Sequence, residues 1–199
     1  MRYQCKFFDV SATSIPWQDI GSIYLKEVVT GKSPRLRTSV KACWNDEALL
    51  IRFECEDDHI VATMSKRDDP LYQEDVVEVF LDLHGTGKMY YEFEVSPLNV
   101  VFDAIIYNDL QGNIIGKPSW DATGLQTSVN LHSNGIWLYD IKIPFFDLGN
   151  PPSNGTEWRW NLFRIDKNLQ GERNYWAWSP TGEVQFHLPQ YFGTLVFHR

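Results

Sequence analysis

The chain has 199 residues and a formal net charge of −8. An acidic surface repels phosphate groups, so nucleic acid and anionic membranes are poor partners, and a neutral ligand or a cation fits better. No stretch approaches the ~20 consecutive apolar residues that a membrane-spanning helix needs. The opening MRYQCKFFDV lacks the apolar core of a signal peptide, and no segment suggests a protein partner. Localisation therefore stays open.

Aromatic residues make up 15% of the chain, which favours β-sheet because aromatic and β-branched side chains suit a pleated surface. Short apolar-alternating runs are separated by turn residues throughout, and they cover 38–44, 49–56, 75–82, 89–96, 101–107, 125–131, 136–144, 157–166, 174–179 and 193–199. So many strands need two packed sheets. The sequence predicts an all-β fold with one domain over 1–199. We expect a two-sheet antiparallel β-sandwich of immunoglobulin or jelly-roll type, with about nine to eleven strands.

The first clear unit is a hairpin over 38–56, closed by a short loop at Asn45–Ala48. Closing it there puts six apolar residues on one face, in three facing pairs: Val40 with Phe53, Ala42 with Ile51, and Trp44 with Leu49. In this register Cys55 points inward and Cys43 outward, so they cannot form a disulfide. With Cys5 the cysteine count is odd. We expect free thiols.

Acidic pairs follow in the next loops, at Asp57-Asp58 and Asp68-Asp69. Oxygen-rich loops suit Ca²⁺, which takes six to eight oxygen ligands, although the spacing of an EF-hand is missing. Solvated turn residues are the simpler interpretation. No other cofactor is required by any pattern in the chain.

The strand 75–82 alternates most regularly, with Val77, Val79 and Leu81 on one face and Glu78 on the other. On the strand 89–96 the polar face carries Glu92, Glu94 and Ser96. The three glutamates can form a row across neighbouring strands. Such a row can be merely solvated, can bind a ligand, or can supply the two carboxyl groups of a glycosidase. Outside this row, the sequence has no motif of nucleophilic, zinc or phosphate chemistry, and its five histidines are scattered.

Aromatic side chains in polar loops are the remaining candidates for a ligand site, because a sugar stacks its C–H face on an aromatic ring. Tyr72 precedes the 75–82 strand, beside Asp69, Pro70 and Gln73. Late in the chain Trp178 and Phe186 stand in a stretch rich in Pro, Gly and further aromatic residues. Core packing is the simpler interpretation for any one of them.

Five segments taken together resemble carbohydrate-binding module family 9, including its CBM9-like relatives in the DOMON-like sandwich group. They are WNDEALLIRFECEDD (44–58), DPLYQEDVVEVFLD (69–82), YYEFEVSP (90–97), WRWNLFRID (158–166) and FHLPQYFGTLVF (186–197). The resemblance covers about residues 10–199. It implies a two-sheet sandwich that binds a mono- or oligosaccharide without catalysis and carries structural calcium. The best-described members belong to xylan- and cellulose-degrading enzymes and are usually secreted or on the cell surface.

The resemblance also implies site residues. Family members clamp a sugar, notably at its reducing end, between two aromatic rings, which fall on Tyr72 and on or close to Phe186. A strand glutamate that accepts sugar hydroxyls falls on Glu78. The Arg and Asn of the next strand are replaced by Glu94 and Ser96 here, and a Gln by Phe163.

Three functions follow from these observations. The first is a non-catalytic module that stacks a sugar on Tyr72 and Phe186. The second is a glycoside hydrolase, related to endo-xylanases, that uses Glu78 and Glu94. The third is a sandwich that has lost its sugar site and serves as an interaction domain, for which an apolar patch near Tyr72 would be the sign.

Overall fold

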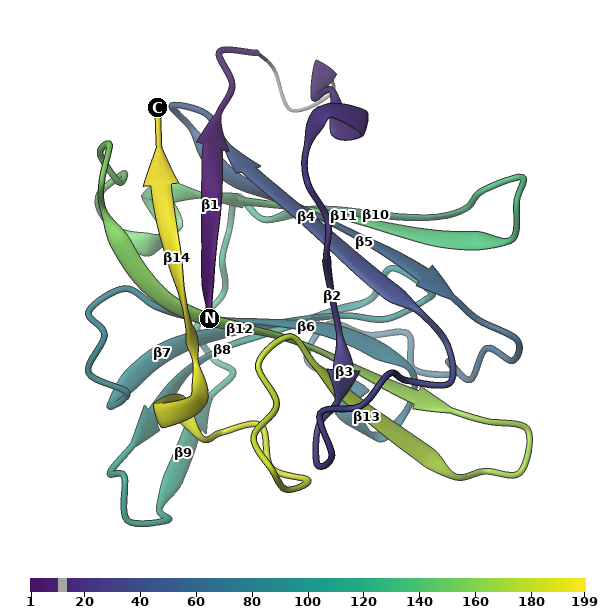
Figure 1. Ribbon diagram of the computed structural model, residues 1–199. Coiled ribbons are helices and arrows are strands. Elements are labelled where there is room, and N and C mark those ends of the chain that lie inside the picture. The colour runs from purple at the N-terminus through teal and green to yellow at the C-terminus, as the bar shows by residue number, and fades with distance from the viewer. Residues whose placement is uncertain (11–13) are drawn as a thin grey trace.

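The computed structural model describes residues 1–10 and 14–199, and within them β-strands predominate (Figure 1). The strands are β1 (Arg2–Phe7), β2 (Ile23–Tyr24), β3 (Lys26–Glu27), β4 (Thr38–Trp44), β5 (Ala48–Glu56), β6 (Val76–Asp82), β7 (Met89–Val95), β8 (Val101–Asn108), β9 (Ile114–Lys117), β10 (Gln126–Leu131), β11 (Ile136–Pro144), β12 (Glu157–Lys167), β13 (Arg173–Ala177) and β14 (Gly193–His198). Short helical turns lie at η2 (Trp17–Asp19), η3 (Leu71–Gln73), α1 (Phe145–Leu148) and η4 (Pro189–Tyr191). All the runs predicted as strands form strands; β1, β2, β3 and β9 are additional.

The strands form the two layers of a β-sandwich, as predicted. One layer has the order β10-β11-β5-β4 and the other β12-β6-β7-β8-β9, while β1 and β14 lie between β4 and β12 and join the layers (Figure 1). The pairing is antiparallel except at β1, which runs parallel to both β14 and β4. Strand β1 thus links the chain's two ends, because its partner β14 is the last strand.

The main core fills the space between the layers. Val77, Val79 and Leu81 of β6 point into it, as the alternation predicted. Facing them are residues of β4, β5 and β11, including Val40, Ala42, Ile51, Phe53 and Ile141. Burial of these aliphatic and aromatic side chains is the main force that holds the layers together.

The β4–β5 hairpin has the predicted register, with Trp44 opposite Leu49 and Thr38 opposite Cys55. All three cysteines are free and buried, which confirms the prediction of free thiols. Cys43 pairs with Leu50 on the face away from the main core, as predicted, but this face is not open to solvent. Its face of the hairpin is covered by a small apolar cluster with Ile15 and Ile20, so the thiol is buried there.

The outer face of the second layer is also covered, and this positions the candidate site. Every residue of β6 is buried, including those that point away from the main core. A second apolar cluster forms over this face from strand residues such as Phe80 and Phe163 and from Phe186 and Phe192 near the end of the chain. The later part of the segment 178–192, which joins β13 to β14 and contains Phe186 and Phe192, thereby lies across the outer face of the sheet. No helix of the described residues is long and apolar enough to span a membrane.

Candidate functional site

A pocket of about 640 Å³ opens on the outer face of the second layer, beside the segment 178–192. Its volume lies within the range typical of small-molecule sites. Its walls are mainly apolar: Phe102, Ile106, Ile114, Ile165, Tyr175 and Val184 line them. Its acidic residues include Glu78 of β6 together with Glu92 and Glu94 of β7. Apolar walls around a few converging polar groups are the usual make-up of a ligand site.

Tyr72 lines this pocket and is 48% exposed. It stands in the short turn η3, which is fixed by its neighbour Leu71, buried in the second apolar cluster. Asp69 steadies the start of this loop by accepting hydrogen bonds from two backbone N–H groups, at 2.9 and 3.1 Å. The turn thus buries one residue and presents the next, and the Tyr72 ring is available to a ligand.

Phe186 also lines the pocket but is largely buried, with 8% of its surface exposed. Its ring stacks on Phe163 of β12 with the centroids 4.1 Å apart and the planes 11° from parallel. The Tyr175 ring packs edge-to-face with the Phe186 ring, and the two ring centroids are 6.1 Å apart. Phe163 thus supports Phe186, and this second aromatic ring forms part of the wall.

The acidic residues of the pocket form one tight group. Glu78 lies directly opposite Glu94 in the β6–β7 pairing, and Glu92 is two residues along on the same face. Each of the three offers a carboxylate oxygen within 4.8 Å of those of the other two. The residues are only 2%, 6% and 1% exposed for Glu78, Glu92 and Glu94. Like charges directly opposite in a sheet are destabilising, so this arrangement costs stability.

Burial controls the protonation of this group. It raises the pKa of Glu92 to about 8. It raises the pKa of Glu78 well above its ordinary value, and the nearby charge of Glu92 adds to the effect. The pKa of Glu94 is raised by burial and then by the other two carboxylates, against a hydrogen bond from the Tyr72 backbone. Oε1 of Glu78 and Oε2 of Glu94 have no hydrogen-bond partner among the described residues.

His187 is a pocket residue that the sequence prediction did not assign. Its ring stacks on Phe80 at 5.0 Å, and its Nδ1 lies 2.9 Å from the Tyr90 hydroxyl. Its Nε2 lies 4.0 Å from Glu92. Burial lowers the pKa of His187 to about 4, so the ring is neutral near pH 7. His187 therefore anchors the segment 178–192 to the sheet without adding positive charge. In the sequence, only its position just after Phe186 could have indicated that His187 lies in the pocket.

Two of the predicted site residues lie elsewhere. Trp178 is buried in the main core, with its ring 5.6 Å from that of Trp160. Ser96 is buried at the end of β7, where its hydroxyl accepts a hydrogen bond from the Val100 N–H at 3.2 Å. Neither lines the pocket, whereas Tyr72, Glu78, Glu94 and Phe186 all do.

Three of the four acidic residues considered for calcium already have partners. Asp57 is buried and accepts a hydrogen bond from Arg164 at 2.8 Å. Asp58 pairs with Arg35, and Asp69 accepts the two backbone N–H groups described above. These carboxylates are compensated, and their surroundings do not fit a calcium ion.

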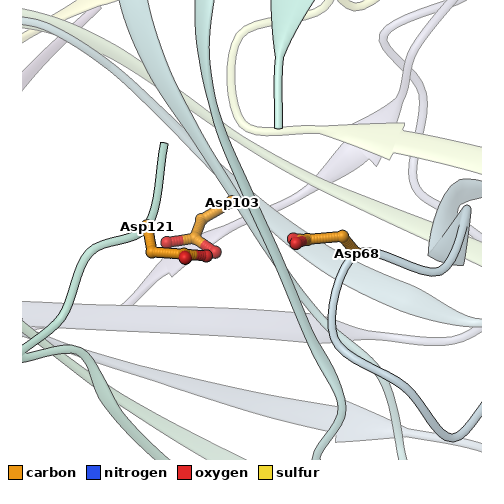
Figure 2. Close-up of side chains that lie close together, drawn as sticks. All are labelled: Asp68, Asp103 and Asp121. Atoms are coloured by element: carbon orange, nitrogen blue, oxygen red, sulfur yellow. The ribbon is translucent and has the colours of Figure 1, made fainter. Parts of the chain in front are cut away.

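The fourth, Asp68, lies close to Asp103 and Asp121 (Figure 2). The three carboxylates are the kind of donor that Ca²⁺ prefers, and Oδ1 of Asp68 lacks a hydrogen-bond partner among the described residues. Arg67, however, donates to Asp121 at 2.8 Å and pairs with the buried Asp103. A guanidinium already supplies the positive charge, so this set is a poor fit for a resident calcium ion.

Comparison with known proteins identifies the family of this chain. A family described as carbohydrate family 9 binding domain-like matches residues 11–199. An extracellular protein of Arthroderma benhamiae is 28% identical over 204 residues, which cover 94% of this chain and 90% of the relative.

Solved structures share the fold. A family 9 carbohydrate-binding module from Caldicellulosiruptor kristjanssonii, in complex with cellotriose, has a TM-score of 0.74 at 17% identity and covers 100% of this chain and 94% of the module. A family 9 module from the same organism in complex with glucose has a TM-score of 0.75 at 16% identity, covering 100% and 97%. Because the family match spans nearly the whole chain, this protein belongs to the carbohydrate family 9 binding domain-like family.

Proposed function

We propose that the pocket over β6 and β7 binds a mono- or oligosaccharide and does not transform it. The observation that carries this proposal is the joint position of Tyr72, Glu78 and Phe186, which line one pocket although Phe186 lies far from the other two in the sequence. An aromatic ring offers a stacking surface for the C–H face of a sugar. A carboxyl group can accept a hydrogen bond from a sugar hydroxyl or, when it is protonated, donate one to it. The solved family 9 modules that bind cellotriose and glucose support the ligand class.

In this proposal the two aromatic rings contribute differently. Tyr72 is half exposed and supplies the adjustable platform, whereas Phe186 is held in the wall by its stacking on Phe163. Glu78 supplies the hydrogen bond at the base of the site. Such a single site has few strong contacts, so we expect dissociation constants in the micromolar to millimolar range, or about −8 to −4 kcal/mol.

Catalysis by Glu78 and Glu94 is the less supported alternative. A glycosidase needs one protonated and one ionised carboxyl group at the same pH. Burial raises the pKa of both Glu78 and Glu94, so their surroundings shift the two groups in the same direction and do not separate an acid from a base. A family of binding domains also favours binding. Steady hydrolysis of aryl glycosides that is lost in Glu94→Gln would establish the enzyme instead.

An interaction domain without a sugar site is likewise less supported. That hypothesis expects an apolar patch beside Tyr72, whereas the space there is a pocket with carboxyl groups. The polar groups would have no purpose in an apolar docking surface, because burying them unpaired is costly.

Calorimetric titration with glucose, cellotriose and xylotriose tests the proposal. We expect at least one of these sugars to bind the wild-type protein and Tyr72→Ala to bind it about fivefold to tenfold more weakly, since one stacking contact contributes on the order of 1 kcal/mol. Tyr24→Ala is the matched control, because Tyr24 is equally exposed, at 51%, and lies on β2. Equal affinity in wild type and Tyr72→Ala would rule out the assigned site.

A further inference from the structure

The acidic group in the pocket is larger than a neutral sugar needs. One carboxyl group can fix a hydroxyl, yet Glu78, Glu92 and Glu94 converge within 4.8 Å of one another. Two of their oxygens, on Glu78 and Glu94, have no partner among the described residues, although both side chains are almost fully buried. Buried polar atoms without partners are rare in folded proteins, and they point to a binding partner that the pocket receives.

The acidic groups around the pocket outnumber the basic ones. Its lining holds four carboxyl groups, because Asp68 adds to the three glutamates, against one guanidinium, that of Arg173. Arg173 is exposed and directed at the Tyr72 carbonyl, at 3.4 Å. His187 adds no charge near pH 7 because burial lowers its pKa to about 4. The pocket therefore has more acidic groups than basic ones, and a bound cation would balance the excess.

The walls show which kind of cation fits. A metal ion would use the carboxylates but leave a cavity of about 640 Å³ with aromatic walls unfilled. A sugar that carries a protonated amino group uses the aromatic walls and the carboxylates together. Its ring stacks on Tyr72, while its ammonium group binds the carboxylates. Aromatic faces also attract cations, and Tyr72, Tyr175 and Phe186 surround the space.

From these observations we infer that the pocket selects amino sugars, binding their ammonium group at Glu78, Glu92 and Glu94 in preference to neutral sugars. This inference rests on the proposed carbohydrate-binding function and names its ligand class. Protonated carboxyl groups in the free pocket release protons as the ammonium enters, and the resulting carboxylates make charge-assisted hydrogen bonds, which are about twice as strong as neutral ones.

The test compares three sugars that share one ring: glucosamine, glucose and N-acetylglucosamine. Calorimetric titrations at about pH 7 should give glucosamine at least about tenfold tighter binding than glucose, and N-acetylation, which removes the charge, should abolish this preference. In Glu92→Gln and Glu94→Gln the ratio of the glucose and glucosamine dissociation constants should fall below about threefold. Glu47→Gln, at a side chain that is 76% exposed, is the control and should behave as wild type.

Each outcome decides the inference. Equal affinity for glucosamine and glucose overturns it and leaves the proposed function standing. Failure of every sugar to bind overturns both. Titration with Ca²⁺ alone covers the other cation: if Ca²⁺ binds the wild type, fails to bind Glu92→Gln, and glucosamine shows no preference, the glutamates form a metal site and the inference is wrong.

Discussion

At the scale of single residues, substitutions of the two aromatic residues of the pocket should distinguish an effect on sugar binding from an effect on stability. Tyr72 is half exposed, so Tyr72→Ala should change the free energy of unfolding by no more than about 0.5 kcal/mol while it weakens sugar binding. Phe186 is buried against Phe163, so Phe186→Ala should destabilise by about 3 kcal/mol. Urea denaturation measures both values. A large loss of stability in Tyr72→Ala would show that its ring packs in the fold and is not a platform.

Glu94 should be a residue that the fold tolerates at a cost. It faces Glu78 directly across β6 and β7, and both are buried. Replacing it with Gln keeps the shape and removes one of two opposed carboxyl groups, so we expect Glu94→Gln to raise the free energy of unfolding by about 1 kcal/mol at pH 8. The same change at the exposed Glu157 serves as the control. A destabilised Glu94→Gln would show that the hydrogen bond from the Tyr72 backbone to this carboxyl group outweighs the cost of the opposed pair.

The same glutamates predict how stability depends on pH. The pKa of Glu92 rises on folding from an ordinary value of 4.5 to about 8, so between these values the folded state holds a proton that the unfolded state has lost. Stability therefore falls as pH rises through this window. His187 acts with the opposite sign below its ordinary pKa of 6.5, so this opposing effect is absent between pH 6.5 and 8. The pKa values of Glu78 and Glu94 are also raised, and these residues act there in the same direction as Glu92.

In that interval the melting temperature of the wild type should fall with rising pH, and that of Glu92→Gln should fall less. The measurement is a series of thermal melts at constant ionic strength. Parallel curves for the two proteins would contradict the assignment of this effect to Glu92.

At the scale of elements, ion pairs connect the loop before η3 to the strand β8. Arg67 of the loop pairs with the buried Asp103 of β8 and with Asp121. Removing it in Arg67→Ala leaves acidic groups without compensation, which we expect to cost about 1–3 kcal/mol. Because Asp68 lies beside the same carboxylates, the variant should recover part of this loss in millimolar Ca²⁺.

Thermal melts with calcium and with a chelator measure this recovery. The control is Arg2→Ala, which breaks an exposed ion pair with Glu157 and should change little. If the wild type itself loses stability in chelator, calcium and not Arg67 is the resident cation of the fold.

At the scale of the whole molecule, much of the fold could be predicted because its signals are local. The β4–β5 register follows from apolar residues and one short loop, and the inward face of β6 follows from three aliphatic residues. The pairing of strand β1 could not be predicted in the same way. The residues of β1 alternate regularly between polar and apolar from Arg2 to Phe7, a signal that the strand prediction did not use. Its parallel partner β14 lies at the other end of the sequence, so only the tertiary structure pairs them.

The candidate site was predictable in part for a similar reason. Tyr72, Glu78, Glu94 and Phe186 were candidates from their places in the sequence as well as from the family resemblance, and all line the pocket. Alternation could not decide whether the glutamates are solvated or bind a ligand, since it cannot show that residues such as Phe186 and His187 cover that face. Trp178 was misplaced because it stands at the end of β13 and turns into the main core.

The central claim is that a sugar binds in the pocket over β6 and β7. A crystal structure of the protein soaked with cellotriose and, separately, with glucosamine tests it most directly. We expect a sugar ring that stacks on Tyr72, lies beside Phe186 and forms a hydrogen bond with Glu78. A sugar bound elsewhere on the sandwich, with this pocket unchanged, would contradict it.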